Sequence, residues 1–462
     1  MSVIRLKFSD FFKIIFFPCL SFVICFLIAS LIEPNTFQKF FSAISMEKVI
    51  NNPTITEKAG YYFDVSAYAS NTITNQCSAF YPMLGWVTRY VFKPQNFEQA
   101  VISLRAISST FFVLTIPILS YLLHKITENL RLSFLLTLLY TLSPLSIFRV
   151  IGYTEGLFSF LSIILIYFIS NKKTNYFLTY IATFIVVMIM SLTRPVSLQL
   201  IFSSLLSITV ILLINNLLRN SYKERVPQIY YLQTYQHLIN LSAVIIFSTI
   251  LGYSIYGFIC LQIRGDFLAP FNDQKLWGKE LGFYPQIFLS IEYPLFEQMA
   301  LYFPIFLLVY VLIYTYSFIN KSSVEIFAPK LSLIWGLLSL YPSILLIVYL
   351  TNLVIRKLNK NGLQKLNYPD LIQPLSLISS HLFWFCLSFV ISHILINLFT
   401  VDKLYSLARF TFSLPFFYIF LAYILRTINT KKSELILKLF VVVSAIGLIE
   451  QWIRYGKNQW LG

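Results

Sequence analysis

Long apolar runs separated by short basic loops cover most of the chain. Many runs have about the 20 residues that a helix needs to cross a bilayer. They are continuous rather than alternating, which favours helices because a membrane β-strand alternates apolar and polar positions. The pattern predicts an all-α polytopic bundle of about 12 spans in one integral-membrane domain, residues 1–462. Candidate spans are 12–32, 106–123, 132–150, 156–171, 176–192, 196–218, 241–262, 299–319, 331–355, 375–398, 409–429 and 435–453.

Two stretches, 33–105 and 264–298, are too long and polar to be simple turns. The first run, from Ile14 to Leu31, has no small-residue cleavage site and is expected to be a retained helix. Basic residues before it place the N-terminus inside, so both stretches fall on the outer side. Simple alternation of the later spans then places the basic loop RKLNKNGLQKLNYPD outside, although basic loops favour the inside. Either a re-entrant segment lies within 280–355 or a span is miscounted, so the topology over 280–375 stays open.

Composition supports the membrane prediction and narrows the chemistry. Hydrophobic residues make up 57% of the 462 residues and charged ones 12%, against roughly 25% charged in soluble domains. The net charge of +16 comes mostly from short loops, as in the positive-inside pattern, so we expect no nucleic-acid partner. The chain has no glycine-rich phosphate loop and no HExxH motif, so we expect no cofactor and no metal. Its five cysteines are scattered and mostly in spans, and we expect no disulfide framework.

Ionisable residues at the edges of apolar runs are functional candidates, because charges are costly near hydrocarbon. Carboxylates can accept a proton from a hydroxyl group, and arginines can bind a phosphate through paired hydrogen bonds. Aromatic side chains such as Tyr61 could stack on sugar rings. The simpler interpretation is that interfacial arginines anchor helices and that loop carboxylates are solvated. The candidates are Asp64, Arg149, Glu155, Arg194, Asp266 and Arg409.

Arg194 and Pro195 interrupt about forty nearly continuous apolar residues. Proline is tolerated at the start of a helix, where its missing N–H costs little. We therefore expect Arg194 to lie between two helices at the outer interface, on the same face as Asp64, Glu155 and Asp266. There it could contact a phosphate or only lipid headgroups.

Five motifs follow one another along the chain: SAFYPMLGW (an AFxPxxP-like box), SPLSIFRVIGYTEGLFSF (an SPxxxFxxxxYTE box), SLTRPVSL (a TRPxG box), RGDFLAPFNDQKLWG (GDPLAFxxAQxxWG) and LYSLARFTFSLPFF (S-x-x-RY-x-x-x-x-P). Together they resemble the motifs of the PIG-V family of membrane mannosyltransferases, which is related to the second mannosyltransferase of GPI-anchor assembly, and of its bacterial relatives. They span most of the chain in the expected order.

The resemblance implies a GT-C type glycosyltransferase with a polyprenyl- or dolichyl-phosphate sugar donor, mannose being the expected sugar. It implies inverting transfer to an acceptor hydroxyl, with a carboxylate of the first outer loop as base. Asp64 is the preferred base and Glu47 the alternative. Glu155 and Asp266 would bind acceptor or orient the site, and Arg194 and Arg409 would contact the donor phosphate or brace the helices. The substrate-binding set is Tyr68, Phe80, Tyr81, Pro82, Tyr153, Glu155, Arg194, Asp266, Trp277 and Arg409.

The sequence also departs from the family pattern. It has no Trp-Asp pair, lacks the second proline after Pro82, and has Ser197 where the TRPxG box has glycine. An inactive scaffold subunit is therefore an alternative hypothesis. A transporter or flippase of a lipid-linked saccharide is another, because broken helices and charges within the membrane also suit transporters. Expected partners are membrane lipids, the lipid-linked donor, a glycolipid or glycan acceptor and a small membrane subunit. The expected location is a bacterial inner membrane or the endoplasmic reticulum membrane.

Overall fold

The computed structural model describes residues 8–42, 63–74, 77–171, 175–221, 229–288, 293–319, 380–404, 406–428 and 431–461. Within these ranges every regular element is a helix, which confirms the predicted all-α class for this part of the chain. Among the described residues, seven helices have the length and apolar composition to cross a membrane, so the chain is an integral membrane protein. The predicted span 331–355 and the alternative base Glu47 lie outside the described residues.

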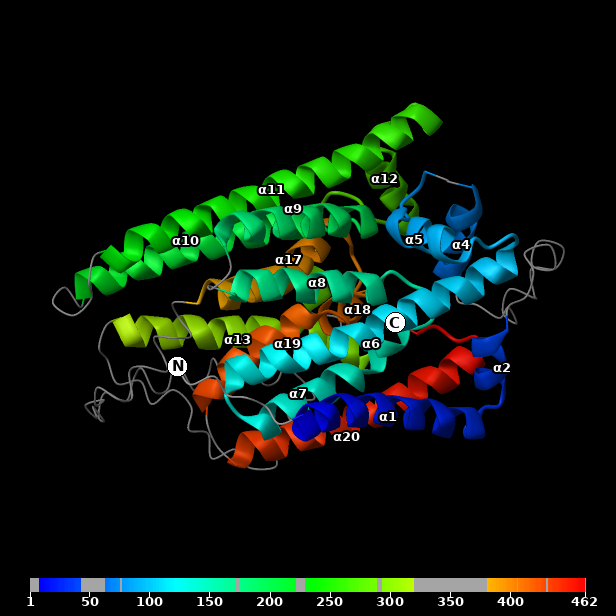
Figure 1. The fold of residues 1–462 in the computed structure, drawn as a ribbon, viewed down its shortest axis with the longest axis horizontal. Helices are drawn as coiled ribbons and strands as arrows, with labels where there is room; N and C mark the ends of the chain where they lie inside the picture. The colour runs from blue at the N-terminus through cyan, green and yellow to red at the C-terminus, as the bar shows by residue number, and fades with distance from the viewer. Residues whose placement is uncertain are drawn as a thin grey trace.

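The described helices are numbered along the chain as in Figure 1. Their bounds are α1 (Phe8–Ile32), α2 (Asn35–Phe41), α4 (Phe63–Thr74), α5 (Met83–Phe92), α6 (Phe97–Thr127), α7 (Leu130–Thr141), η2 (Pro144–Arg149), α8 (Glu155–Ser170), α9 (Tyr176–Thr193), α10 (Ser197–Ser221), α11 (Ile229–Arg264), α12 (Ala269–Asn272), η3 (Asp273–Trp277), η4 (Pro285–Phe288), α13 (Leu295–Ile319), α17 (His381–Thr400), α18 (Leu407–Phe412), α19 (Pro415–Ile428) and α20 (Lys431–Gly456).

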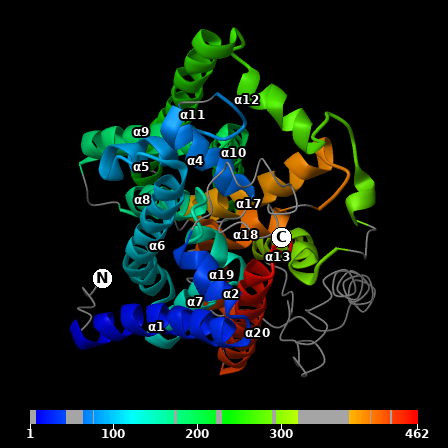
Figure 2. The same cartoon turned by 90° about the vertical axis from the view of Figure 1, so that its right-hand side faces the viewer.

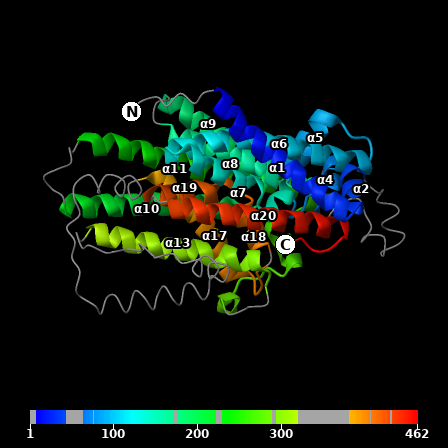
Figure 3. The same ribbon diagram turned by 90° about the horizontal axis from the view of Figure 1, so that it is seen from below.

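The long helices run side by side, and the short helices α2, α4, α5 and α12 gather at one end of the bundle (Figure 1). The view onto that end shows α9, α10 and α11 on one side and α1, α7 and α20 on the other, with α17 and α18 between them (Figure 2). From below, α1 crosses obliquely over the bundle (Figure 3). Helix α17 is enclosed, with 78% of its apolar window buried, whereas the Phe12–Ile32 window is 22% buried. The peripheral helices therefore present the apolar surface that lipid would cover.

Two predicted spans are broken where a proline follows the helix. The span 132–150 divides into α7 and the 3-10 helix η2, which begins at Pro144. The span 409–429 divides into α18 and α19, which begins at Pro415. Proline cannot donate the backbone hydrogen bond that would continue a helix. Both breaks lie inside the protein, where α18 packs against η2.

Arg149 satisfies the carbonyl groups that these breaks leave without partners. Its guanidinium donates to the backbone oxygens of Tyr140 (2.7 Å), Ser413 (2.8 Å) and Phe412 (2.9 Å). It is fully buried and packs on the Tyr140 ring, 3.6 Å from its centroid. The last carbonyls of a helix have no partner within the helix. Arg149, one of the candidates from the sequence, therefore joins α7, η2 and α18.

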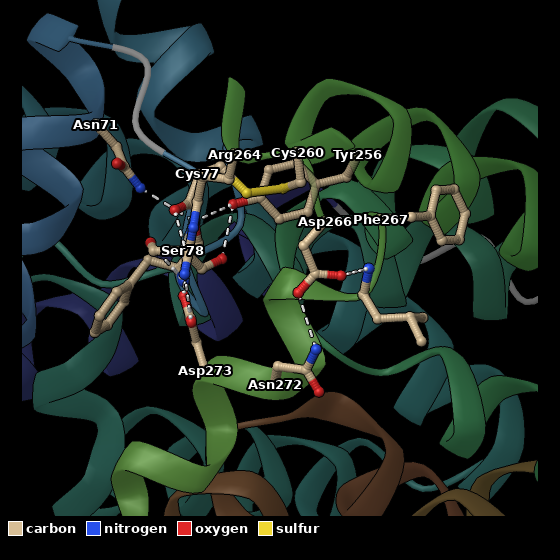
Figure 4. Close-up of a disulfide and its surroundings, with 12 residues drawn as sticks. Asn71, Cys77, Ser78, Tyr256, Cys260, Arg264, Asp266, Phe267, Asn272 and Asp273 are labelled. Atoms are coloured by element: carbon tan, nitrogen blue, oxygen red, sulfur yellow. Dashed lines mark hydrogen bonds and ion pairs between the residues drawn. A yellow bond between two sulfur atoms is a disulfide. The ribbon is translucent and has the colours of Figure 1, made fainter. Parts of the chain in front are cut away.

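A disulfide between Cys77 and Cys260 shows that the expectation of no disulfide framework was wrong (Figure 4). The two cysteines are 183 positions apart. Cys260 lies in the last turn and a half of α11, at the end of the helix nearest α5. Arg264 on the next turn donates to the Cys77 backbone oxygen (3.1 Å). The disulfide and this hydrogen bond fix the segment before α5 to the end of α11.

Candidate active site

Four ionisable residues from distant segments meet at the end of the bundle that carries α4 and α5. Glu155 Oε1 forms ion pairs with Arg194 Nη1 (3.1 Å) and with Arg409 Nε. Arg409 Nη1 lies 3.4 Å from Asp64 Oδ2. We call Asp64, Glu155, Arg194 and Arg409 the charged cluster. Asp64 and Arg409 are 345 positions apart, so only the tertiary fold brings them together.

Glu155 is positioned by the start of α8. It is the first residue of this helix, where the helix dipole favours a carboxylate. The next residue is Gly156, and a Cβ atom there would clash with the carbonyl oxygens of Ser108 and Arg149. Glycine at this position allows the start of α8 to lie directly on α6 and η2, which buries Glu155.

Arg194 is positioned by the break between α9 and α10. Its backbone is extended (φ −154°, ψ 157°), as expected for a residue before proline. Arg194 therefore lies between two helices, as predicted. Its side chain, however, is 5% exposed and points to Glu155. It is an enclosed member of an ion pair and does not lie at the lipid headgroups.

Arg409 is positioned by α18, a short helix whose start is capped by a residue from α13. Ser406 just before it has φ +62°, a left-handed conformation that non-glycine residues adopt uncommonly. The Glu297 side chain accepts a hydrogen bond from the Ala408 backbone N–H (2.9 Å) and is buried. A carboxylate that accepts backbone N–H groups at a helix start stabilises the helix. Glu297 is a positioning residue that the sequence analysis missed.

The two carboxylates of the charged cluster differ in solvent exposure, which indicates different roles. The Glu155 side chain is fully buried, whereas the Asp64 side chain is 19% exposed. Burial raises the pKa of Asp64, and the neighbouring Arg409 partly opposes this rise. Glu155 is thus the internal counter-ion of both arginines. Asp64 is the carboxylate that an incoming hydroxyl group could reach.

Aromatic rings surround the two guanidinium groups. The Arg409 guanidinium carbon lies 4.4 Å from the Tyr153 ring centroid and 4.8 Å from that of Phe148. The Arg194 guanidinium carbon lies 4.6 Å from the Phe410 centroid. Such cation–π contacts gain strength away from water. They help to keep both cations in place where the protein excludes solvent.

The aromatic candidates of the first outer loop fall into two groups. Tyr68 lies on α4 one turn after Asp64, and its ring packs edge-on against Phe80 and Tyr153. Tyr81 packs against Tyr256 in the small core around the disulfide and is 1% exposed. Tyr68 and Tyr153 thus lie beside the charged cluster and Phe80 packs on Tyr68, whereas Tyr81 supports the loop.

The remaining candidates either lie away from the charged cluster or are outside the described residues. Pro82 is the N-cap of α5. Asp266 accepts hydrogen bonds from Leu268 N (2.8 Å) and Asn272 Nδ2 (2.9 Å), and these bonds lower its pKa. It stabilises the turn that leads into α12 (Figure 4) and is not part of the charged cluster. The side chain of Trp277 and the whole of Tyr61 lie outside the described residues.

Lys279 is a neighbour of the charged cluster that the sequence analysis missed. It follows η3 in the second outer loop, and its Nζ donates to Gln274 Oε1 (2.9 Å). Burial, together with the nearby positive charges of Arg194 and Arg409, lowers the pKa of Lys279 to about 8. In the sequence it is one of many loop lysines. The only signal in the sequence that could have singled out Lys279 is that it directly follows the motif RGDFLAPFNDQKLWG.

The charged cluster can accept a proton and offer cations to an anionic group. In the part of the chain that the structure describes, no group of three or more His, Cys, Asp or Glu residues is arranged to hold a metal ion. Comparisons of the chain with protein-family models, with curated proteins and with solved structures find no match.

Proposed function

We propose that this chain is a membrane glycosyltransferase of the GT-C type. It would move a sugar, mannose by its resemblance to the PIG-V family, from a polyprenyl- or dolichyl-phosphate donor to an acceptor hydroxyl. The observation that carries the proposal is the charged cluster. Three of its four residues come from motifs that resemble those of the family, and Asp64 is our preferred match to the family's acidic residue of the first outer loop.

Asp64 is the proposed general base. As the acceptor oxygen attacks the anomeric carbon, its proton moves to Asp64. The bond between the anomeric carbon and the phosphate oxygen breaks, and its electron pair stays on that oxygen. A carboxylate with a raised pKa is a better proton acceptor near neutral pH than an ordinary aspartate. Arg409, 3.4 Å from Asp64 Oδ2, holds the carboxylate in place.

Glu155 and the arginines have the supporting role. The buried Glu155 carboxylate fixes Arg194 and Arg409 relative to each other. The two guanidiniums supply positive charge beside the base in a setting that excludes much water. Fixed charges of this kind stabilise charge that develops during a reaction.

The disulfide supports a site on the lumenal or periplasmic side. Cys77 lies between α4 and α5, and Asp64 of the charged cluster lies on α4, at the end of the bundle where these short helices gather (Figure 1). Disulfides persist in the endoplasmic reticulum lumen and the periplasm and are rare in the cytosol. Helix α6 leads from this end to the basic turn with Lys125 and Arg131, about 46 Å along its axis. Basic loops favour the cytoplasmic side.

The direct test is sugar transfer from labelled polyprenyl-phosphate mannose in membranes that contain the protein. We expect Asp64→Asn to lower the rate about 10²–10⁴-fold, the usual contribution of a general base. Asp402→Asn is the matched control, because Asp402 is an exposed carboxylate in the loop before α18. Glu47→Gln tests the alternative base. Transfer that both Asp64→Asn and Glu47→Gln leave intact would refute the base assignment, and lipid movement across vesicles without transfer would indicate a flippase.

A further inference from the structure

Apolar side chains are exposed in the second outer loop where it passes the end of α17. Leu281 is 95% exposed and Phe283 is 64% exposed. The Phe283 ring packs against that of Phe399 on α17, with 5.7 Å between the ring centroids, and Phe399 is itself 48% exposed. We call Leu281, Phe283 and Phe399 the apolar patch. Neighbouring apolar side chains that stay exposed mark a surface that meets a partner or a membrane.

Backbone hydrogen bonds fix the loop on the last turn of α17. The donors alternate with the two apolar residues of the loop: Glu280 N donates to Thr400 O (2.9 Å), Gly282 N to Phe399 O (3.0 Å) and Tyr284 N to Leu398 O (2.9 Å). The acceptors are the last carbonyl groups of the helix, which have no donor within it. In Figure 2 the green chain after α12 runs along the edge of the bundle, so this loop lies at the periphery.

The depth of the loop in the membrane follows from the length of α17. This helix is one of those able to cross a membrane, and it has 20 residues. At 1.5 Å per residue it is about 30 Å long, which matches the hydrocarbon core of a bilayer. Its last turn therefore lies where hydrocarbon meets the headgroups. Leu398 and Thr400 are about 3 Å apart along the axis, so the hydrogen-bonded loop lies at the same boundary.

Charged and apolar side chains are arranged around this boundary as a bilayer requires. Asp402 and Lys403 are exposed just beyond the end of α17. Glu280 is exposed and pairs with Thr400, the outermost residue of the helix. From there the loop runs inward along α17, past the apolar patch. Charges are costly in hydrocarbon and apolar groups are costly in water, so this order matches the change from headgroups to acyl chains.

We propose that the apolar patch inserts into the boundary layer of the bilayer and holds the second outer loop on the membrane surface. Its partner is lipid, namely the acyl chains next to the headgroups at the α4 and α5 end of the bundle. The patch is continuous with the membrane-spanning surface, because Phe399 belongs to α17 itself. Aromatic side chains are enriched at this depth in membrane proteins. The inference goes beyond the proposed function and does not depend on it.

The experiment measures which medium surrounds each side chain in full-length protein reconstituted into phosphatidylcholine vesicles. A nitroxide is attached to the new cysteine of Leu281→Cys or Phe283→Cys. Electron paramagnetic resonance then compares its collisions with molecular oxygen, which concentrates in hydrocarbon, and with a water-soluble nickel chelate. Both variants carry Cys19→Ser, because Cys19 is partly exposed whereas Cys25 and Cys386 are buried.

Two labelled positions calibrate the measurement. Ile446→Cys is the lipid control, because Ile446 is 63% exposed on the membrane-spanning helix α20. Asp402→Cys is the water control, because Asp402 is an exposed charge just beyond α17. Size-exclusion profiles check that each labelled variant is folded. We expect the ratio of oxygen to chelate collisions at Leu281 and at Phe283 to rise well above that at Asp402, toward that at Ile446.

The other possible surroundings of the patch give different results. A ratio at either patch position equal to that at Asp402 would overturn the proposal, because the loop would then lie in water. Few collisions with both reagents would also overturn it, since a protein surface such as a second copy of the chain would then cover the patch. No sugar donor enters the measurement, so neither result bears on the proposed function.

Discussion

Replacing Glu155 by glutamine would test how the charged cluster is held together. In the structure one carboxylate oxygen of Glu155 faces both Arg194, at 3.1 Å, and Arg409. The substitution keeps the shape of the side chain and removes its charge. Arg409 would still have Asp64 nearby, but Arg194 would lose its counter-ion. The main cost therefore comes from a buried guanidinium without a partner.

The size of this cost follows from the geometry. At an effective dielectric constant of about 20, one ion pair near 3 Å contributes roughly 5 kcal/mol of Coulomb attraction. Desolvation of the charges offsets much of it in the native protein. Removing one partner of a buried pair leaves the other desolvated and costs about 3–5 kcal/mol. Glu155 is fully buried, so we expect Glu155→Gln to lower the free energy of unfolding by that amount.

The assay is unfolding in mixed micelles by titration with SDS. The double variant Glu155→Gln/Arg194→Gln should regain part of the loss, because it removes the stranded charge. Asp64→Asn should cost less than Glu155→Gln, since Asp64 is partly exposed and its removal leaves Arg409 paired to Glu155. The reasoning fails if Glu155→Gln lies within about 1 kcal/mol of the wild type, or if the double variant is less stable than the single one.

Further predictions concern pH, the disulfide and the packing of α8. Because the pKa of Asp64 is raised by burial, the rate of transfer should fall on the acid side at a higher pH than for an ordinary aspartate; a pH profile of kcat/KM with its acid limb near pH 4 would contradict this. Replacing Cys77 and Cys260 by serine should lower the free energy of unfolding by about 2–4 kcal/mol, measured with and without reductant; equal stability would indicate that the bond does not form. Gly156→Ala should destabilise the protein by about 1–3 kcal/mol through overpacking, because the added Cβ would clash with backbone atoms. Thermal unfolding in detergent would measure the effect.

The sequence indicated several members of the site but not their arrangement. Asp64, Glu155, Arg194 and Arg409 stood out because charges are rare beside apolar runs. By the same criterion Arg149 and Asp266 stood out equally, and in the structure one satisfies helix carbonyls and the other caps a turn. A charged residue at the end of an apolar run is recognisable because its position is energetically costly, but the sequence does not identify the residue that pairs with it. Partners are set by long-range packing.

Lys279 and Glu297 show why other members escaped detection. Lys279 is an ordinary loop lysine in the sequence, and only the hydrogen bonds between its loop and the end of α17 fix its place in the structure. Glu297 follows a polar loop in the sequence and becomes the cap of α18 only when α13 packs against that helix. Neither relation has a local pattern, because each joins segments more than one hundred positions apart.

By itself the sequence determined the membrane class, the helical form and the approximate position of most described helices. These features depend on local hydrophobicity and on the need of each backbone to satisfy its own hydrogen bonds in lipid. Only the tertiary structure decided that two apolar runs break at Pro144 and Pro415, that Cys77 pairs with Cys260, and that Arg194 is enclosed beside Glu155. Such pairings lower the free energy only when distant helices come into contact, and the order of residues along the chain does not encode that contact directly.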